Sequence, residues 1–285
     1  MEGVLMLGKR AVIAVRDPQK NIVVEEMGEI KRKGLKIPFV RGIVSLYYSL
    51  SFGLKALDRS AEISTGEEMK KSDSFFSIVL AIILAIGLFV FLPVWITTLL
   101  GFKNNEFLFS LVDGFIRLGF FLLYVWIISL SKDIKRLFMY HGAEHKTIHA
   151  FENNEVLEPK NIRKYSRIHP RCGSNFIMIF LIIAILLFSL VGIFKPLSSV
   201  QRIIVRIVFI PIIASISYEF LKIADKAGKL FKILYFPGML LQFLTTAEPT
   251  DDMLEVAIAS VKAAIKDDKD TTHGGVNDDA VELMG

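Results

Sequence analysis

The 285-residue chain has a single cysteine, Cys172, so no disulfide bond can form within it. This excludes the small secreted scaffolds that depend on disulfides. No signal peptide or lipidation motif opens the sequence, and we therefore expect the first membrane span to act as the targeting signal. Charge is also missing over long stretches, since no side chain between Asp73 and Lys103 is charged. Such runs exclude an acidic disordered chain and an ordinary cytosolic enzyme.

Four segments with few or no charges are long enough to cross a bilayer, which takes roughly 20 apolar residues. They cover residues 74–101, 108–131, 173–194 and 200–221. Asp113 and Arg117 lie four residues apart in the second segment, so they share a helix face and can neutralise each other. We therefore predict an α-helical integral membrane protein with about four transmembrane helices.

Lysine and arginine gather on one side of these spans. The segment before the first span holds 13, the stretch 132–171 holds nine and the part after Glu219 holds seven, whereas the other connections and span ends hold five. The positive-inside rule predicts a bacterial inner-membrane protein with both termini in the cytoplasm. The net charge of +5 then indicates contact with anionic lipid, and we exclude nucleic acid as a partner.

The pattern divides the chain into seven regions. Two β-branched runs on either side of a turn-forming segment, 17–21, predict a small hairpin. Helical periodicity continues from Pro38, but only 42–54 lacks charge there, which favours an interfacial helix over a span. The regions are a cytoplasmic β region (1–36), an interfacial amphipathic helix with a linker (37–72), transmembrane helices 1 and 2 (73–131), a His-rich cytoplasmic segment (132–172), transmembrane helices 3 and 4 (173–222), an interfacial or re-entrant segment (223–247), and a C-terminal helix with a disordered tail (248–285).

Four of the five histidines fall within 29 residues. His141, His145 and His149 are four residues apart, so neighbours share a helix face and can offer two imidazole nitrogens to one cation. Because a straight helix separates His141 from His149 by about 12 Å, the pairs His141/His145 and His145/His149 are alternatives. His169 and Cys172 offer further ligands, and imidazole with thiolate suits zinc. The competing interpretation is a solvated helix face, with Cys172 a small buried residue before a span.

Residues 141–145 also match H-x-x-E-H, the inverted zinc-peptidase pattern, in which the histidines bind the metal and Glu144 is the general base. A further ligand or an alternative base would be a downstream acid, and Glu219 is the candidate. If the second span continued straight, His141 would lie about 15 Å beyond the membrane surface. Contact with Glu219 would then need a bend at Gly142 or an interfacial tilt, and His169 and Cys172 are better placed to meet it.

Segments spread over nearly the whole chain resemble a known family. HGAEHK at 141–146 and HPRCGSNF at 169–176 are the most specific, together with residues 2–8, 38–42 and 241–249. They are similar to the bacterial YqhQ-like membrane proteins, whose mechanism is uncharacterised and which are described as predicted metal-dependent enzymes. Leu7 and Ser174 depart from that pattern. The resemblance implies metal dependence and little more.

Two functions follow from these patterns. One is a zinc-dependent hydrolase at the inner leaflet, acting on a peptide or a lipid-linked substrate. The other is a non-enzymatic assembly or quality-control factor that docks a membrane complex such as the translocon, with the His-rich segment structural. A transporter is disfavoured, because the spans have few polar groups and no repeated broken helices. The number of protein ligands separates the first two, since structural zinc has four and catalytic zinc leaves a position open.

Overall fold

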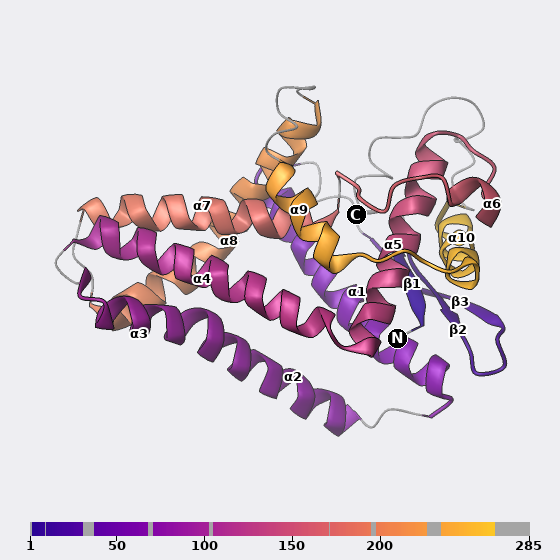
Figure 1. Ribbon diagram of the computed structural model, residues 1–285, viewed down its shortest axis with the longest axis horizontal. Coiled ribbons are helices and arrows are strands. Elements are labelled where there is room, and N and C mark those ends of the chain that lie inside the picture. The colour runs from indigo at the N-terminus through magenta and orange to yellow at the C-terminus, as the bar shows by residue number, and fades with distance from the viewer. Residues whose placement is uncertain are drawn as a thin grey trace.

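The computed structural model has two parts, a bundle of long apolar helices and a smaller part built around a sheet. Figure 1 shows the bundle on the left and the sheet, with α5, α6 and α10, on the right. The structure describes residues 2–8, 10–30, 37–67, 71–102, 105–170, 172–194, 198–226 and 235–265. The predicted disordered tail lies outside these residues.

The sheet has three antiparallel strands in the order β1-β2-β3. They are β1 (Gly3–Leu7), β2 (Arg10–Arg16) and β3 (Ile22–Glu29). The predicted hairpin corresponds to β2 and β3. Its turn is closed by the Asp17 carboxylate, which accepts the backbone N–H of Asn21 at 2.7 Å. Strand β1 was not predicted from the sequence, although it pairs with β2 over five residue positions, from Gly3 opposite Val15 to Leu7 opposite Ala11.

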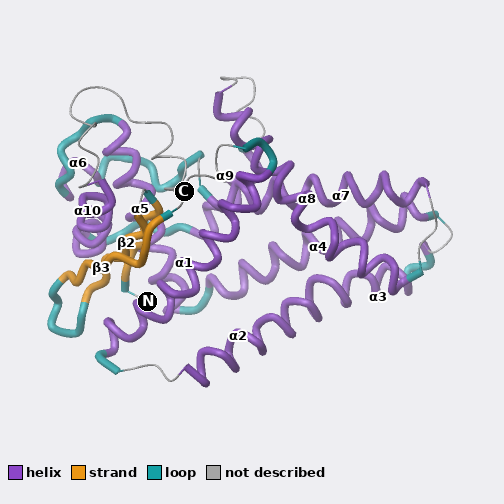
Figure 2. The backbone as a smooth tube through the Cα atoms, turned by 180° about the vertical axis from the view of Figure 1, so that it is seen from behind, coloured by secondary structure: helices purple, strands orange, loops and turns teal. Residues whose placement is uncertain are grey.

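Strand β2 is buried on both faces because a helix covers each side of the sheet. Ala14 packs in a core with residues of α10 (Asp251–Ile265), whereas Ile13 and Val15 pack against Ala56 of α1 (Val40–Thr65). Figure 2 shows the strands between these two helices. The alternation of side chains along a strand explains why the run from Ala11 to Val15 is continuously apolar.

Four helical stretches are long and apolar enough to cross a membrane. Their bounds are Phe75–Leu99, Glu106–Ser129, Gly173–Leu190 and Val200–Ile223, close to the four predicted spans. The first consists of α2 (Lys71–Ile86), the π-helical turn η1 (Gly87–Phe91) and α3 (Leu92–Leu99), the second is α4 (Glu106–Ser129), and the others lie in α7 (Gly173–Phe194) and α8 (Ser199–Lys226). No residue in the 18-residue apolar window of the first span is buried within the chain, whereas Pro93, Val94 and Thr97 at its α3 end are buried.

The remaining helices place the histidines at the end of the bundle. Helix α5 (Lys132–Glu152) follows α4 after a break at Leu130 and Ser131, and it turns away from the direction of α4 (Figure 1). The bend therefore lies before α5. It does not lie at Gly142, because α5 is unbroken there. A short α6 (Pro159–Ile162) follows, and α9 (Phe236–Thr245) packs on α7 and α4 beside α5.

Candidate metal centre

Two histidines on consecutive turns of α5 are oriented by backbone carbonyls. His141 Nδ1 lies 2.8 Å from the carbonyl oxygen of Thr245, and His145 Nδ1 lies 2.6 Å from that of Arg167. A carbonyl can only accept a hydrogen bond, so Nδ1 must carry the proton in both rings. Each ring therefore keeps a lone pair on Nε2, which is the arrangement found in metal-binding histidines.

These two imidazoles face the buried thiol of Cys172. His141 Nε2 lies 3.2 Å from Cys172 Sγ, and one potential ligand atom from each of the three residues lies within 4.8 Å of the others. Burial lowers the pKa of His145. Burial alone would raise the pKa of Cys172, but its interaction with His145 lowers it. Two imidazole lone pairs and one sulfur thus converge, and the single S–H proton can satisfy only one of the nitrogens.

Glu144 lies between the two histidines in the sequence and close to the same group. The residue is partly exposed but its carboxyl group lies in a buried environment, and among the described residues no hydrogen bond or ion pair holds it. Burial raises the pKa of Glu144 to about 7, while the neighbouring His141 acts to lower it and Cys172 to raise it. The carboxylate is therefore close to the proposed ligands without belonging to the convergent set.

A second group of potential ligands lies farther along α5. It contains His149, Glu152 and His169, whose potential ligand atoms lie within 4.8 Å of one another. His149 Nε2 faces the carbonyl oxygen of Ile168 at 2.9 Å, and His169 Nε2 lies 3.2 Å from the Glu152 carboxylate. The rings of His145 and His169 are 5.8 Å apart, so the two groups are neighbours. Glu152, three residues after His149, was missed from the sequence, although that spacing places both on one helix face.

The segment that ends α9 supports both groups. The Gln242 amide forms two hydrogen bonds with the backbone of His169, one to its carbonyl oxygen and one from its N–H, both at 2.8 Å. Thr245 supplies the carbonyl that orients His141. Thr246 accepts hydrogen bonds from the side chain of Arg167, whose own carbonyl orients His145. Gln242 was also missed, and its only signal is an amide within an apolar run.

Glycine at position 142 allows this segment to approach α5. A Cβ at Gly142 would lie 2.1 Å from the carbonyl oxygen of Ala247. The contact is fixed by the backbone N–H of Ala247, which donates to the carbonyl of Phe138 at 2.8 Å. The close approach therefore holds Thr245 where its carbonyl meets His141.

Glu219 is held elsewhere. Its carboxylate accepts a hydrogen bond from Arg41 Nε at 2.6 Å and one from the backbone N–H of Phe39 at 2.9 Å. Neither group of potential ligands found among the described residues includes it. The structure thus brings the other six predicted site residues together around α5, with Glu152 beside them, and leaves Glu219 joining α8 to the start of α1. Glu219 is held there because Arg41 supplies the opposite charge to its carboxylate.

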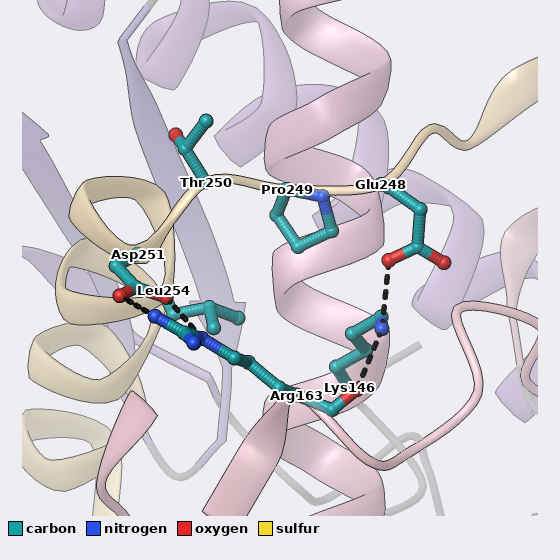
Figure 3. Close-up of a pocket in the computed structure, with 7 residues that line it drawn as sticks. All are labelled: Lys146, Arg163, Glu248, Pro249, Thr250, Asp251 and Leu254. Atoms are coloured by element: carbon teal, nitrogen blue, oxygen red, sulfur yellow. Dashed lines mark hydrogen bonds and ion pairs between the residues drawn. The ribbon is translucent and has the colours of Figure 1, made fainter. Parts of the chain in front are cut away.

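A cavity of about 490 Å³ lies beside the site on the α10 side. Figure 3 shows the buried Lys146 side chain reaching Glu248 at 2.7 Å and the carbonyl oxygen of Arg163 at 3.0 Å. Arg163 in turn pairs with Asp251 at the start of α10. No residue of either ligand group lines this cavity. Lys146 therefore connects α5, the α6 segment and the segment after α9 around the site.

Comparisons with known proteins support a family assignment. Residues 37–267 match a family described as a protein of unknown function, DUF1385. The chain is 33% identical over 263 residues to the uncharacterized protein YqhQ of Bacillus subtilis (strain 168), a match that covers 81% of this chain and 78% of that protein. No solved structure matches the chain significantly.

Proposed function

The chain belongs to the DUF1385 family, as its resemblance to YqhQ-like proteins predicted, and we propose that it is a zinc-dependent hydrolase of the bacterial inner membrane. His141, His145 and Cys172 would hold the ion, and Glu144 would act as the base. The substrate would be a peptide or a lipid-linked molecule at the membrane surface that α5 faces.

The exposed apolar surface supports insertion in a bilayer. Phe75, Phe76 and Ile83 of α2 are each at least 60% exposed, and they belong to a span with an 18-residue apolar window in which no residue is buried within the chain. In water a surface of this kind would promote aggregation. In a bilayer it contacts apolar acyl chains, and the helix satisfies its own backbone hydrogen bonds. A bilayer is therefore the proposed partner of the four spans.

The metal proposal is carried by the convergence of three electron-pair donors. In the described structure, two imidazole nitrogens are held facing one sulfur, and the single S–H proton can satisfy only one of these nitrogens. A cation of borderline softness with imidazole and thiolate ligands relieves that conflict, and zinc is such a cation. We assign the ion to this group and not to the second, because Glu152 and His169 already satisfy each other by a hydrogen bond.

The number of potential protein ligands favours a catalytic zinc site over a structural one. Among the described residues the group offers three potential protein ligands, which is the number in catalytic zinc sites, while structural zinc sites have four. A bound zinc ion lowers the pKa of its water to about 7. Glu144 would take the proton of a water molecule at this site, because its carboxylate is close by and otherwise unpaired among the described residues. Thr245 and Arg167 would keep the two histidines in the binding tautomer.

The metal assignment is tested on purified full-length protein by measuring metal content. We expect close to one zinc ion per chain in the wild type and a loss of that ion in His145→Ala. His149→Ala is the matched control, since it removes an imidazole one turn away on the same helix and should keep the ion. Full metal content in His145→Ala would refute the assignment, and loss in His149→Ala alone would move the ion to the second group.

The enzyme assignment is tested through Glu144→Gln, which keeps the volume and a hydrogen-bonding group but cannot take a proton. Metal content and folding should be unchanged. General base catalysis contributes about 10²–10⁴-fold to a rate, so this variant should rescue a deletion phenotype only weakly. Full rescue by Glu144→Gln together with failure of His145→Ala would favour the alternative, a non-enzymatic assembly or quality-control factor with a structural metal.

A further inference from the structure

A cluster of charges lies inside the bundle, far from the histidines. Asp113 of α4 is 1% exposed and receives two guanidinium groups. Arg117 Nη2 lies 2.9 Å from Asp113 Oδ2, and Arg206 Nη2 of α8 lies 2.7 Å from the same oxygen. The sequence predicted only the pair of Asp113 and Arg117. The third member leaves two positive charges and one negative charge in this cluster.

A second acid at this end of the bundle is already paired. Glu106, at the start of α4, forms a salt bridge with Arg202 of α8. Asp113 can balance only one of its two arginines, and Glu106 is paired with Arg202, so one positive charge remains in surplus beside Asp113. An uncompensated charge in a low-dielectric environment is costly, and charged residues within spans commonly mark a ligand site.

A cavity of about 220 Å³ opens beside these arginines. Arg117 and Arg206 line it, and the rest of the lining is almost entirely apolar, from η1, α4, α7 and α8. Ile207 and Ile210 on its α8 wall are 58% and 46% exposed, so the cavity reaches the lipid-facing surface. Its volume greatly exceeds the roughly 15 Å³ that one water molecule requires.

The lining is polar at one end and apolar at the other. Arg206 and Ile213, both lining residues, are seven residues apart on α8, which corresponds to about 10 Å of helix. Arg206 is seven residues after Ser199, at the end of the bundle where both α4 and α8 begin (Figure 1). A ligand with its charged group at the arginines would therefore extend its apolar part toward the centre of the bilayer.

The π-helical turn η1 fixes one wall of this cavity. Such turns frequently occur at functional sites, where the ordinary helical hydrogen bonds are interrupted. Here the carbonyl oxygen of Phe89 in η1 accepts a hydrogen bond from Arg117 Nε at 2.8 Å. This bond and the bond to Asp113 hold the Arg117 guanidinium at the cavity. The arginine is thus fixed in position before any ligand binds.

We propose that this cavity binds a singly charged anionic amphiphile of the membrane, with its anionic group at Arg117 and Arg206 and its acyl chain along the apolar lining. One negative charge balances the one surplus positive charge. A phosphodiester lipid headgroup and a fatty carboxylate both have this chemistry. The inference rests on the proposed membrane insertion and is independent of the metal centre.

The test uses delipidated full-length protein in a neutral detergent. Native mass spectrometry and thermal unfolding compare four probes at matched ionic strength: phosphatidylglycerol, phosphatidylcholine of the same chain length, a fatty carboxylate, and inorganic phosphate with chloride. We expect one anionic amphiphile per chain, bound in preference to phosphatidylcholine. Whichever of phosphatidylglycerol and the carboxylate binds more tightly identifies the source of the anionic group.

Two variants separate a ligand site from a structural clamp. Arg117→Gln leaves Asp113 and Arg206 as a neutral pair, so the bundle should fold, and binding of the anionic amphiphile should weaken about 10-fold to 100-fold. Ala184→Phe fills the cavity from α7 without changing charge and should weaken it as well. Arg10→Gln, in the sheet, is the control for loss of one arginine and should bind as the wild type does.

Three results would overturn the proposal. Wild-type affinity in Arg117→Gln would mean that the arginines only clamp Asp113. Equal binding of phosphatidylglycerol and phosphatidylcholine would indicate ordinary annular lipid. Stabilisation by inorganic phosphate or chloride equal to that by the amphiphiles would mean that a small ion suffices. Failure of membrane insertion itself would show separately, as a chain that leaves the membrane fraction without detergent.

Discussion

At the scale of single residues, Gln242 links the site to its support. It is fully buried and bonds to both the N–H and the carbonyl oxygen of His169. A buried amide with both ends satisfied fixes the position of its partner, because any displacement breaks two hydrogen bonds together. His169 is therefore held from outside the helix that carries the other histidines.

Replacing Gln242 by methionine should destabilise the protein, because the shape is nearly kept while two backbone groups of His169 lose their partners. Each unsatisfied buried polar group costs about 1–3 kcal/mol. Thermal unfolding in detergent measures the loss. Gln19→Met, at an exposed turn, is the control and should unfold as the wild type does. An unchanged unfolding temperature in Gln242→Met would mean that water replaces the amide.

The sequence was informative about these residues only where chemistry and spacing agreed. His141 and His145 could be paired from a four-residue spacing on a helix. The association of Cys172 with them, rather than with Glu219, depended on the turn between α4 and α5, which periodicity does not reveal. The ion pair of Glu219 with Arg41 was not predicted, because Arg41 lies 178 positions earlier in the chain.

At the scale of elements, the close contact of α5 with the segment after α9 depends on the absence of a side chain at Gly142. Alanine there should displace Ala247 and with it the carbonyl of Thr245. Overpacking of this kind costs about 1–3 kcal/mol. Thermal unfolding and zinc titration should both show the effect, with weaker zinc binding, since His141 loses its orienting carbonyl.

Gly53→Ala is the matched control for this variant. Gly53 also lies within a helix, α1, but a Cβ there meets no atom within 4 Å. Alanine has a higher helix propensity than glycine, so this change should be neutral or stabilising by up to about 1 kcal/mol. Equal behaviour of the two variants would contradict a packing role for Gly142.

The contact between the start of the sheet and α5 should be sensitive to pH. Partial burial acts to raise the pKa of Glu2, but hydrogen bonds from Arg136 and Tyr140 hold it below its ordinary value of 4.5. A lowered carboxyl pKa adds stability above the unfolded pKa, and this stability is lost as the pH falls through the folded value. Unfolding temperatures of wild type and Glu2→Gln should therefore differ at pH 7 and converge below about pH 4.5. A constant difference would exclude the ion pair as its cause.

Elements were predictable from the sequence in proportion to their length and periodicity. The four long apolar helices needed only composition, because crossing a bilayer sets a minimum length. Strand β1 was missed because Gly3–Leu7 is too short to show a period, and it forms only by pairing with β2. Helix α10 was predicted from its apolar stripe, but that stripe does not identify β2 and α5 as its neighbours.

At the scale of the whole molecule, the candidate metal centre exists only because three distant segments meet. Helix α5 provides two histidines, the residues before α7 provide Cys172, and the end of α9 provides the orienting carbonyl of Thr245. Contacts over such sequence separations follow from how the bundle and the sheet part pack together. A pattern within one helix could therefore suggest the metal, while the complete ligand set required the fold.

The same architecture makes a sharp prediction about topology. If α4 spans the membrane, residues before and after it must lie on opposite sides, and the distribution of lysine and arginine predicts residue 104 outside and residue 156 inside. A membrane-impermeant maleimide should then label Asn104→Cys in intact cells and Val156→Cys only after permeabilisation. Val156 is 63% exposed, and wild type is the control because Cys172 is only 3% exposed. Labelling of both variants in intact cells would mean that α4 does not cross, and labelling of Val156→Cys alone would place the histidines outside the cell and the arginine cavity in the inner leaflet.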